Sequence, residues 1–334
     1  MPKEGPFNSC LICASPDTQI LTSNQSFGIN LFRCNACGFV QSEFVSDRAL
    51  EYYYAHFYRR RLNDCELAGH RLKGKAQANG QIAYLLEQQP HLKVGTALDY
   101  GTAEGSLAHE LRAIADKVFA TEMDPQFVEL LKADPLINLV DHQDLAAGGF
   151  DSFFDLICIS HVLEHLTDPY IVMDLFARLM KPGGLLLVDI PNEVRMLAHG
   201  FQAKGHLLYF TKEAFAKFVE TQGAFDLLEI RTCNREVDFF IASRFSAPEE
   251  YSIPLAKDGT TIRAVLRSRE GAVGRSRRGH AFDEAALLNE YSARLLLFYQ
   301  LLAVSQAKVA ELERELQRAR SSPGGGAVGT SVAA

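Results

Sequence analysis

The sequence has no apolar stretch long enough to span a membrane, and its first residues lack the apolar core of a secretory signal peptide. Positive charge is also scarce, because 34 lysines and arginines stand against 41 aspartates and glutamates and leave a formal net charge of −7. The first shortage argues against a membrane-spanning protein, and the second against a broadly basic nucleic-acid-binding surface. Together they predict a cytoplasmic protein whose partner is not nucleic acid.

Length and composition agree with a soluble enzyme that has one main domain and smaller attachments. The chain has 334 residues, and 47% of them are hydrophobic, which is enough to fill a sizeable core.

A glycine turn that follows an apolar run is the most informative motif. Residues 97–107 read ALDYGTAEGSL, so the run stops at Asp99, passes through Gly101 and Gly105, and leads into a helical pattern. Glycine lets the backbone approach a ligand closely, and the unpaired N–H groups at a helix start attract anionic groups. This order predicts a nucleotide-binding strand, turn and helix.

Acidic residues end the next two apolar segments. Glu122 follows residues 118–120, and Asp141 ends residues 137–141. A carboxylate at a strand tip can accept hydrogen bonds from both hydroxyls of a ribose. Two further strands are expected at residues 154–160 and 184–190, and strands that alternate with helices predict a doubly wound, parallel α/β sheet.

Residues 94–246 resemble a class I S-adenosylmethionine (SAM) methyltransferase with a Rossmann-like sheet. The glycine turn, the two acid-tipped strands, SHVLEHLTDP at residues 160–169 and KPGG at residues 181–184 carry this resemblance. It implies that SAM is the cofactor and that its binding residues are Asp99, Gly101 and Gly105 for the methionine part, Glu122 for the ribose, Asp141 for the adenine, and Ser160 at the end of the fourth strand. The chain departs from the family at Ala103, where the middle glycine is usual.

A nicotinamide-dependent dehydrogenase is the rival interpretation of the same turn. That class needs a Gly-x-Gly-x-x-Gly spacing, and the third glycine is missing here. Glu104 would also repel a pyrophosphate, whereas it is compatible with the sulfonium and ammonium groups of SAM.

Four of the seven cysteines form two C-x₂-C pairs near the N-terminus. Cys10 and Cys13 make the first pair, and Cys34 and Cys37 make the second. This spacing predicts a zinc ribbon over residues 1–48, in which the four thiolates bind a structural Zn²⁺ ion. So small a unit buries little core, so the metal is expected to supply its folding energy. Short strands are expected at residues 18–21 and 31–33.

The sequence HVLEH at residues 161–165 fits the H-x-x-E-H pattern of inverted zinc peptidases. Its place between a strand and a helix of the SAM-binding series, and the lack of a clear third ligand downstream, favour a simpler interpretation. Glu164 is expected to favour the positive end of a helix, and His165 to pack or hydrogen-bond under the cofactor.

His206 is the candidate catalytic residue. It lies in GHLLYF at residues 205–210, which resembles the H-E-H-L-x-Y-F stretch of sugar C-methyltransferases, whose last histidine belongs to the catalytic apparatus. Gly205 replaces the glutamate of that stretch, so the resemblance leaves His206 as a base or as a hydrogen-bond donor to substrate. The ribbon and the aromatic residues 52–58 also resemble the leader of bacterial methyltransferases that act on nucleotide-linked sugars or surface polysaccharide.

The remaining segments are interpreted from their composition. Residues 49–93 are expected to be a helical connector, and residues 227–233 and 238–244 a terminal antiparallel strand pair. After them we expect a basic linker (247–281), a long coiled-coil-like helix that makes a homo-oligomer (282–320) and a disordered tail (321–334).

These observations predict a SAM-dependent methyltransferase with a structural zinc ribbon. Its acceptor is expected to be a nucleotide-linked sugar or glycan of cell-surface polysaccharide or secondary metabolite biosynthesis. The alternatives are an NAD-dependent dehydrogenase and a zinc-ribbon adaptor that uses a degenerate methyltransferase fold as a binding module.

Overall fold

The computed structural model describes residues 9–24, 29–43, 50, 53–54, 62–192, 194–197, 205–234 and 259–271. The predicted strand at 238–244, the coiled-coil-like helix with its oligomer, and the tail lie outside these residues.

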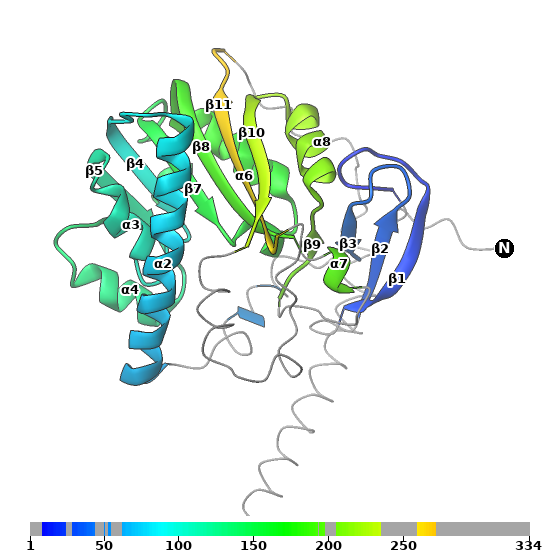
Figure 1. The fold of residues 1–334 in the computed structure, drawn as a ribbon, viewed down its shortest axis with the longest axis horizontal. Helices are drawn as coiled ribbons and strands as arrows, with labels where there is room; N and C mark the ends of the chain where they lie inside the picture. The colour runs from blue at the N-terminus through cyan, green and yellow to red at the C-terminus, as the bar shows by residue number, and fades with distance from the viewer. Residues whose placement is uncertain are drawn as a thin grey trace, which may run out of the picture. The chain divides into compact units, whose positions relative to one another are not determined.

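A seven-stranded sheet forms the main domain, with the strand order β10-β11-β8-β7-β4-β5-β6 (Figure 1). Its strands are β4 (Val94–Tyr100), β5 (Ala115–Thr121), β6 (Asn138–Leu139), β7 (Phe154–Ser160), β8 (Met180–Pro191), β10 (Phe225–Cys233) and β11 (Thr261–Ser268). The five strands from β6 to β8 are parallel, and β11 pairs antiparallel with both β8 and β10. The predicted doubly wound, Rossmann-like class is confirmed.

Helices follow the strands in sequence. They are α2 (Asp64–Gln88), α3 (Ser106–Leu111), α4 (Pro125–Lys132), α5 (His142–Ala146), the 3₁₀ helix η2 (Leu163–His165), α6 (Pro169–Leu179), α7 (Val194–Leu197) and α8 (Lys212–Gln222).

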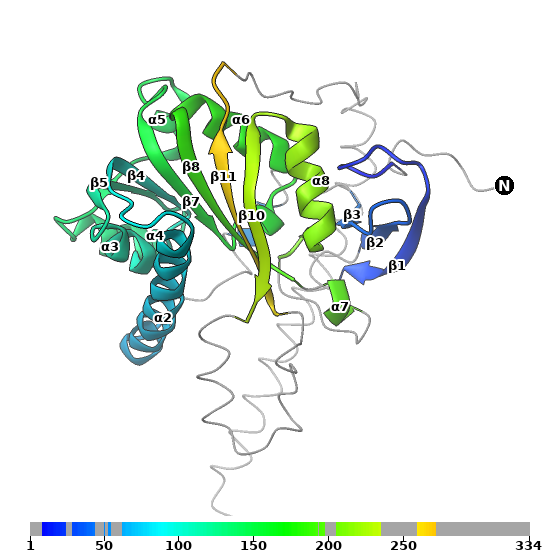
Figure 2. The same cartoon turned by 45° about the horizontal axis from the view of Figure 1, so that its top comes forward.

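Alternating apolar residues explain why both faces of the sheet are covered. Leu98 and Ile157 belong to the core that contains α6 and α8, whereas their neighbours Ala97 and Leu156 belong to the core that contains α2 and α3. Since successive side chains of a strand point to opposite faces, a nearly continuous apolar strand needs a helical layer on each side. Figures 1 and 2 show these two layers, with α2 and α3 on one side of the sheet and α6 and α8 on the other.

The antiparallel edge corrects one prediction. The partner of β10 is Thr261–Ser268, so this part of the predicted basic linker 247–281 is a strand of the sheet, and the predicted domain end at residue 246 is wrong. The basic composition of this segment favours a linker, but Arg263 is 2% exposed, and its Nη2 lies 3.0 Å from Oδ2 of Asp189 on β8. An arginine whose charge is paired in this way can occupy a buried strand.

The ribbon has its own four-stranded antiparallel sheet. The predicted hairpin is confirmed as β1 (Thr18–Asn24) and β2 (Ile29–Cys34), and β3 (Val40–Ser42) follows it. The fourth strand is β9 (Leu208–Tyr209), which comes from the loop that carries His206. The backbone N–H and the hydroxyl of Ser42 both donate to the carbonyl of Leu207, each over 2.9 Å. The ribbon is therefore joined by hydrogen bonds to the segment predicted to carry catalysis.

In the part of the chain that the structure describes, no helix has the length and apolar character needed to cross a bilayer.

Candidate functional site

The glycine turn has the backbone geometry that its sequence requires. Gly101 and Gly105 have positive φ angles of 76° and 88°, which side chains other than glycine rarely adopt. A Cβ on Gly101 would lie 2.5 Å from Cγ2 of Val162, so the turn packs directly against the residue that precedes η2. Ala103 also has a positive φ, of 52°, so the alanine takes up the conformation of the missing glycine.

Asp99 lies beneath the turn at the end of β4. It is 2% exposed, and its Oδ2 accepts a 2.5 Å hydrogen bond from the hydroxyl of Thr102. Burial raises the pKa of Asp99 to about 7, although hydrogen bonds from Thr102 and the backbone of Ala108 oppose this rise. The Asp99 side chain therefore stabilises the glycine turn through its hydrogen bond with Thr102.

Glu122 lies at the tip of β5 and faces the same turn. Its Oε2 accepts from the backbone N–H of Ala103 over 2.6 Å, and its Oε1 accepts from the N–H groups of Met123 and Asp124. These bonds hold the carboxylate against the turn and leave acceptor capacity on Oε2, since a carboxylate oxygen accepts more than one hydrogen bond.

The carboxylate of Glu104 is buried and contacts two side chains rather than solvent. Its Oε2 lies 2.7 Å from Nδ1 of His70 on α2, and its Oε1 accepts from the hydroxyl of Ser106. Burial alone would raise the pKa of Glu104, but the hydrogen bond and charge of His70 outweigh burial and lower it. This contact connects α2 to the turn.

Asp141 and Ser160 are placed differently. Asp141 caps α5 by accepting from the N–H of Gln143 over 2.8 Å, and the next residue, His142, stacks on Tyr100 with ring centroids 4.8 Å apart. Ser160 ends β7, and its hydroxyl accepts from Nε2 of Gln81 over 2.7 Å. Asp141 follows β6 and Glu122 follows β5, so both lie at the carboxyl ends of neighbouring parallel strands. Ser160 instead belongs to a buried polar network that continues through Gln81 to Asp189.

A second cluster combines Glu164, His165 and His206. Glu164 is 1% exposed, and its Oε1 lies 3.9 Å from Nε2 of His165 and 3.9 Å from Nε2 of His206. The two imidazole rings meet edge to face with centroids 4.5 Å apart. Nδ1 of His161 is 3.4 Å from the same carboxylate oxygen. One buried carboxylate is thus surrounded by three imidazoles.

Burial and charge act in opposite directions within this cluster. Burial lowers the pKa of His165 to about 4, despite the opposing charge of Glu164, so the ring is neutral near pH 7. Burial alone would raise the pKa of Glu164, but contact with His161 and the charges of the neighbouring imidazoles lower it.

Backbone hydrogen bonds hold the two halves of the cluster together. The carbonyl of Glu164 accepts from the N–H of Leu207 over 2.8 Å, and the carbonyl of Gly205 lies 3.1 Å from Nδ1 of His165. Because Val162 packs against Gly101, this cluster begins directly behind the glycine turn. The carboxyl edge of the sheet therefore carries both the predicted cofactor residues and the predicted catalytic histidine.

The four ribbon cysteines fit the predicted metal. Their sulfur atoms all lie within 4.8 Å of one another, and the pairs Cys10–Cys37 and Cys13–Cys34 are each 3.6 Å apart. Four thiolates about 2.3 Å from a tetrahedral Zn²⁺ lie about 3.8 Å from one another, whereas a disulfide joins sulfurs at about 2.05 Å. The donor set therefore fits Zn²⁺ and does not form disulfides.

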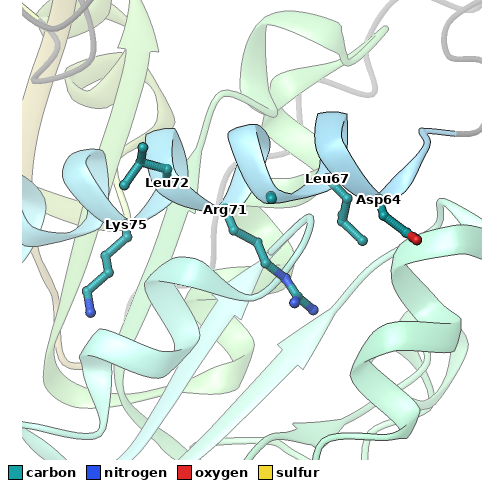
Figure 3. A pocket seen from close by; sticks show the side chains of 6 residues that line it. Asp64, Leu67, Arg71, Leu72 and Lys75 are labelled. Carbon is teal, nitrogen blue, oxygen red and sulfur yellow. The ribbon is translucent and has the colours of Figure 1, made fainter.

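A hollow along α2 is separate from these groups. Its lining consists of Asp64, Leu67, Ala68, Arg71, Leu72 and Lys75 (Figure 3). All six residues belong to one helix, and none of them is a predicted cofactor, metal or catalytic residue.

Comparison with known families decides the class of the fold. A family model described as a methyltransferase domain matches residues 54–229, just over half of the chain. The chain belongs to this methyltransferase family. The match covers the glycine turn, Glu122, Asp141, the Glu164 cluster and most of the sheet.

Curated relatives of this methyltransferase include two ubiquinone biosynthesis O-methyltransferases. The protein from Xanthomonas oryzae pv. oryzae is 32% identical over 102 residues, which is 28% of this chain and 42% of that protein. The protein from Xylella fastidiosa is 30% identical over 119 residues, which is 34% of this chain and 48% of that protein. This chain therefore spans less than half the length of either relative.

Among solved structures, a SAM-dependent methyltransferase from Archaeoglobus fulgidus is 17% identical to this methyltransferase. It overlaps 56% of this chain and 92% of its own, with a TM-score of 0.42.

Sequence reasoning missed how Glu164 and His165 contribute to the site. The pattern HVLEH points to these residues, but the sequence alone shows no clear third metal ligand to accompany them. The structure supplies that third group as His206, which is 41 residues after His165 in the sequence and lies against it in space.

Proposed function

We propose that this chain transfers a methyl group from SAM to a hydroxyl group of a nucleotide-linked sugar or glycan. The carrying observation is the carboxyl edge of the sheet, where the glycine turn and Glu122 lie next to the cluster that contains His206. The glycine turn and Glu122 suit a nucleoside with a cationic tail, and the cluster that contains His206 suits proton transfer from an acceptor.

The proposed roles follow from these positions. Bound SAM supplies a methyl group that its sulfonium already activates. Glu122 would accept hydrogen bonds from the ribose hydroxyls, Asp141 would contact the adenine, and the backbone of Gly101 and Gly105 would pass close to the methionine part. His206 would act on the acceptor, because it lies on the loop after β8, away from the strand tips that are proposed to hold the nucleoside.

The acceptor class rests on two considerations. The zinc ribbon and GHLLYF at residues 205–210 resemble sugar and polysaccharide methyltransferases, which favours a sugar as the acceptor. The curated relatives are O-methyltransferases of ubiquinone biosynthesis, which favours oxygen as the receiving atom but suggests an acceptor of ubiquinone biosynthesis instead, for which we use phenols as test substrates. Both acceptors present a hydroxyl that must lose its proton.

Glu122→Ala is expected to weaken SAM binding by roughly ten- to a hundredfold, because charge-assisted hydrogen bonds to the ribose are lost. Titration calorimetry measures this change directly. The matched control is Glu129→Ala, which removes an exposed glutamate of α4 and is expected to leave SAM affinity unchanged. A folded Glu122→Ala protein with wild-type SAM affinity would refute the assignment.

The same calorimetry separates the two enzyme classes, because a methyltransferase binds SAM and not NADH, whereas a dehydrogenase binds NADH and not SAM. An activity assay separates both from an adaptor, which gives no product. Transfer of labelled methyl from SAM is then measured with nucleotide sugars and with polyhydroxylated phenols. Product from the phenols alone would reject the sugar assignment and keep the reaction type.

A further inference from the structure

Two possible metal-ligand atoms face each other inside the Glu164 cluster. The carbonyl of Gly205 can only accept a hydrogen bond, so Nδ1 of His165, 3.1 Å away, is placed to donate to it. The other ring nitrogen of His165, Nε2, lies 3.9 Å from Oε1 of Glu164. An imidazole nitrogen and a carboxylate oxygen are both common ligands of divalent cations.

The surroundings of the Glu164 carboxylate also favour a cation. Both oxygens are buried and make no hydrogen bond within the part of the chain that the structure describes, and Nδ1 of His161 approaches Oε1 only to 3.4 Å. An ionised carboxylate without such partners is costly to bury, and proteins normally neutralise it with a paired charge or a metal ion. Nε2 of His206 approaches the same oxygen at 3.9 Å and completes a set of three possible ligands.

We propose that Glu164, His165 and His206 bind a divalent cation. Ligand atoms about 2.0 to 2.2 Å from a tetrahedral ion lie about 3.4 Å apart, so the observed 3.9 Å separations need to shrink by only about half an ångström. Two imidazoles and one carboxylate bind zinc, cobalt and iron, and such a set leaves coordination positions open.

The surroundings resemble those of a metal site in two further ways. A ligating histidine usually donates its other ring N–H to a carbonyl or carboxylate, as His165 does to Gly205. The N–H of Leu207 donates to the carbonyl of Glu164, which fixes the His206 loop to η2. These two hydrogen bonds tie the segment of Glu164 and His165 to the loop that carries His206.

The chemical role of the cation rests on the proposed function, whereas its binding does not. An acceptor hydroxyl that coordinates the cation has a lowered pKa, so its proton passes to water. The electron pair of that oxygen forms the new bond to the methyl carbon, and the electron pair of the breaking C–S bond stays on sulfur. In this scheme His206 acts as a ligand that places the acceptor.

Cobalt binding tests the proposal, with the ribbon kept filled with zinc. The protein is first dialysed against a chelator until elemental analysis shows about one zinc per chain, and Co²⁺ is then added. We expect about one Co²⁺ to bind with the spectrum of nitrogen and oxygen ligands, without the sulfur charge-transfer bands that four thiolates give. Glu164→Gln and His206→Asn are each expected to weaken Co²⁺ binding by at least ~10–100-fold.

His109→Asn is the matched control, because His109 lies 2.8 Å from Asp134 in a histidine–carboxylate pair outside the cluster. This variant is expected to keep wild-type Co²⁺ affinity. Absence of Co²⁺ binding, sulfur-type bands alone, or unchanged affinity in both cluster variants would overturn the proposal. SAM affinity is measured on the same samples. Failure of Co²⁺ binding with intact SAM binding rejects the cation alone, whereas failure of SAM binding rejects the proposed function.

Discussion

His206→Ala is expected to lower turnover on the true acceptor by ~10²–10⁴-fold and to leave SAM affinity nearly unchanged. The proposed SAM contacts lie on the turn after β4 and at the tips of β5 and β6, whereas His206 lies on the loop before β9. Removal of its imidazole deletes either a base or a cation ligand without touching those strands. Steady-state kinetics with calorimetry on the same protein measures both quantities.

The two roles of His206 predict different kinetic behaviour. A cation ligand makes turnover depend on added Co²⁺ or Zn²⁺ and on chelators, whereas a base does not. His91→Ala, at an exposed histidine between α2 and β4, is the control and is expected to behave as wild type. Wild-type kinetics from His206→Ala with an unchanged melting curve would exclude both roles.

The main sheet could be predicted because its signals are local. The central parallel strands contain apolar runs of a few residues, and the turn after β4 needs glycines where φ is positive. The acids that end the second and third strands are likewise visible in the sequence. Such features need no knowledge of distant contacts, and their alternation with helices then predicts a parallel sheet.

The antiparallel edge could not be predicted in the same way. Thr261–Ser268 contains two arginines, and a segment with that composition favours solvent unless its charges are paired. The partner of Arg263 is Asp189, 74 residues earlier, and Gln81 of α2 donates to the same carboxylate over 2.7 Å. Only the folded chain brings these groups together, so the strand was interpreted as part of a linker.

The candidate site shows the same division. The pattern HVLEH is local and drew attention to Glu164 and His165, but their partner His206 lies on a separate loop. That loop reaches them because β9 pairs with β3 of the ribbon and because Leu207 donates to Glu164. The spacing of residues in the sequence does not predict that the His206 loop lies against Glu164 and His165. This contact depends on the packing of the ribbon against the main domain.

The ribbon is therefore expected to influence catalysis through β3 and β9. Cys34 is the last residue of β2, its N–H donates to the carbonyl of Phe39, and the neighbouring Arg33 pairs with Val40 of β3. Val40 in turn pairs with Tyr209 of β9, three residues after His206. Phe39 and Phe210 add an aromatic contact between the same segments, with centroids 4.9 Å apart. We therefore expect that loss of the metal from the four-cysteine site displaces the loop that carries His206 through these contacts.

Cys34→Ser is accordingly expected to lose the ribbon zinc and, with it, the order of residues 29–43, because a structural zinc supplies much of the folding free energy of so small a unit. Displacement of the His206 loop by about 1 Å is enough to lower turnover by about 10²-fold, while SAM affinity should change far less. Elemental analysis, hydrogen exchange over residues 29–43 and 205–210, and kinetics measure the three effects. Cys65→Ser, at an exposed cysteine of α2, is the control. Zinc loss with unchanged exchange at residues 205–210 would show that the ribbon does not hold the loop, and retained zinc would refute the ligand assignment of Cys34.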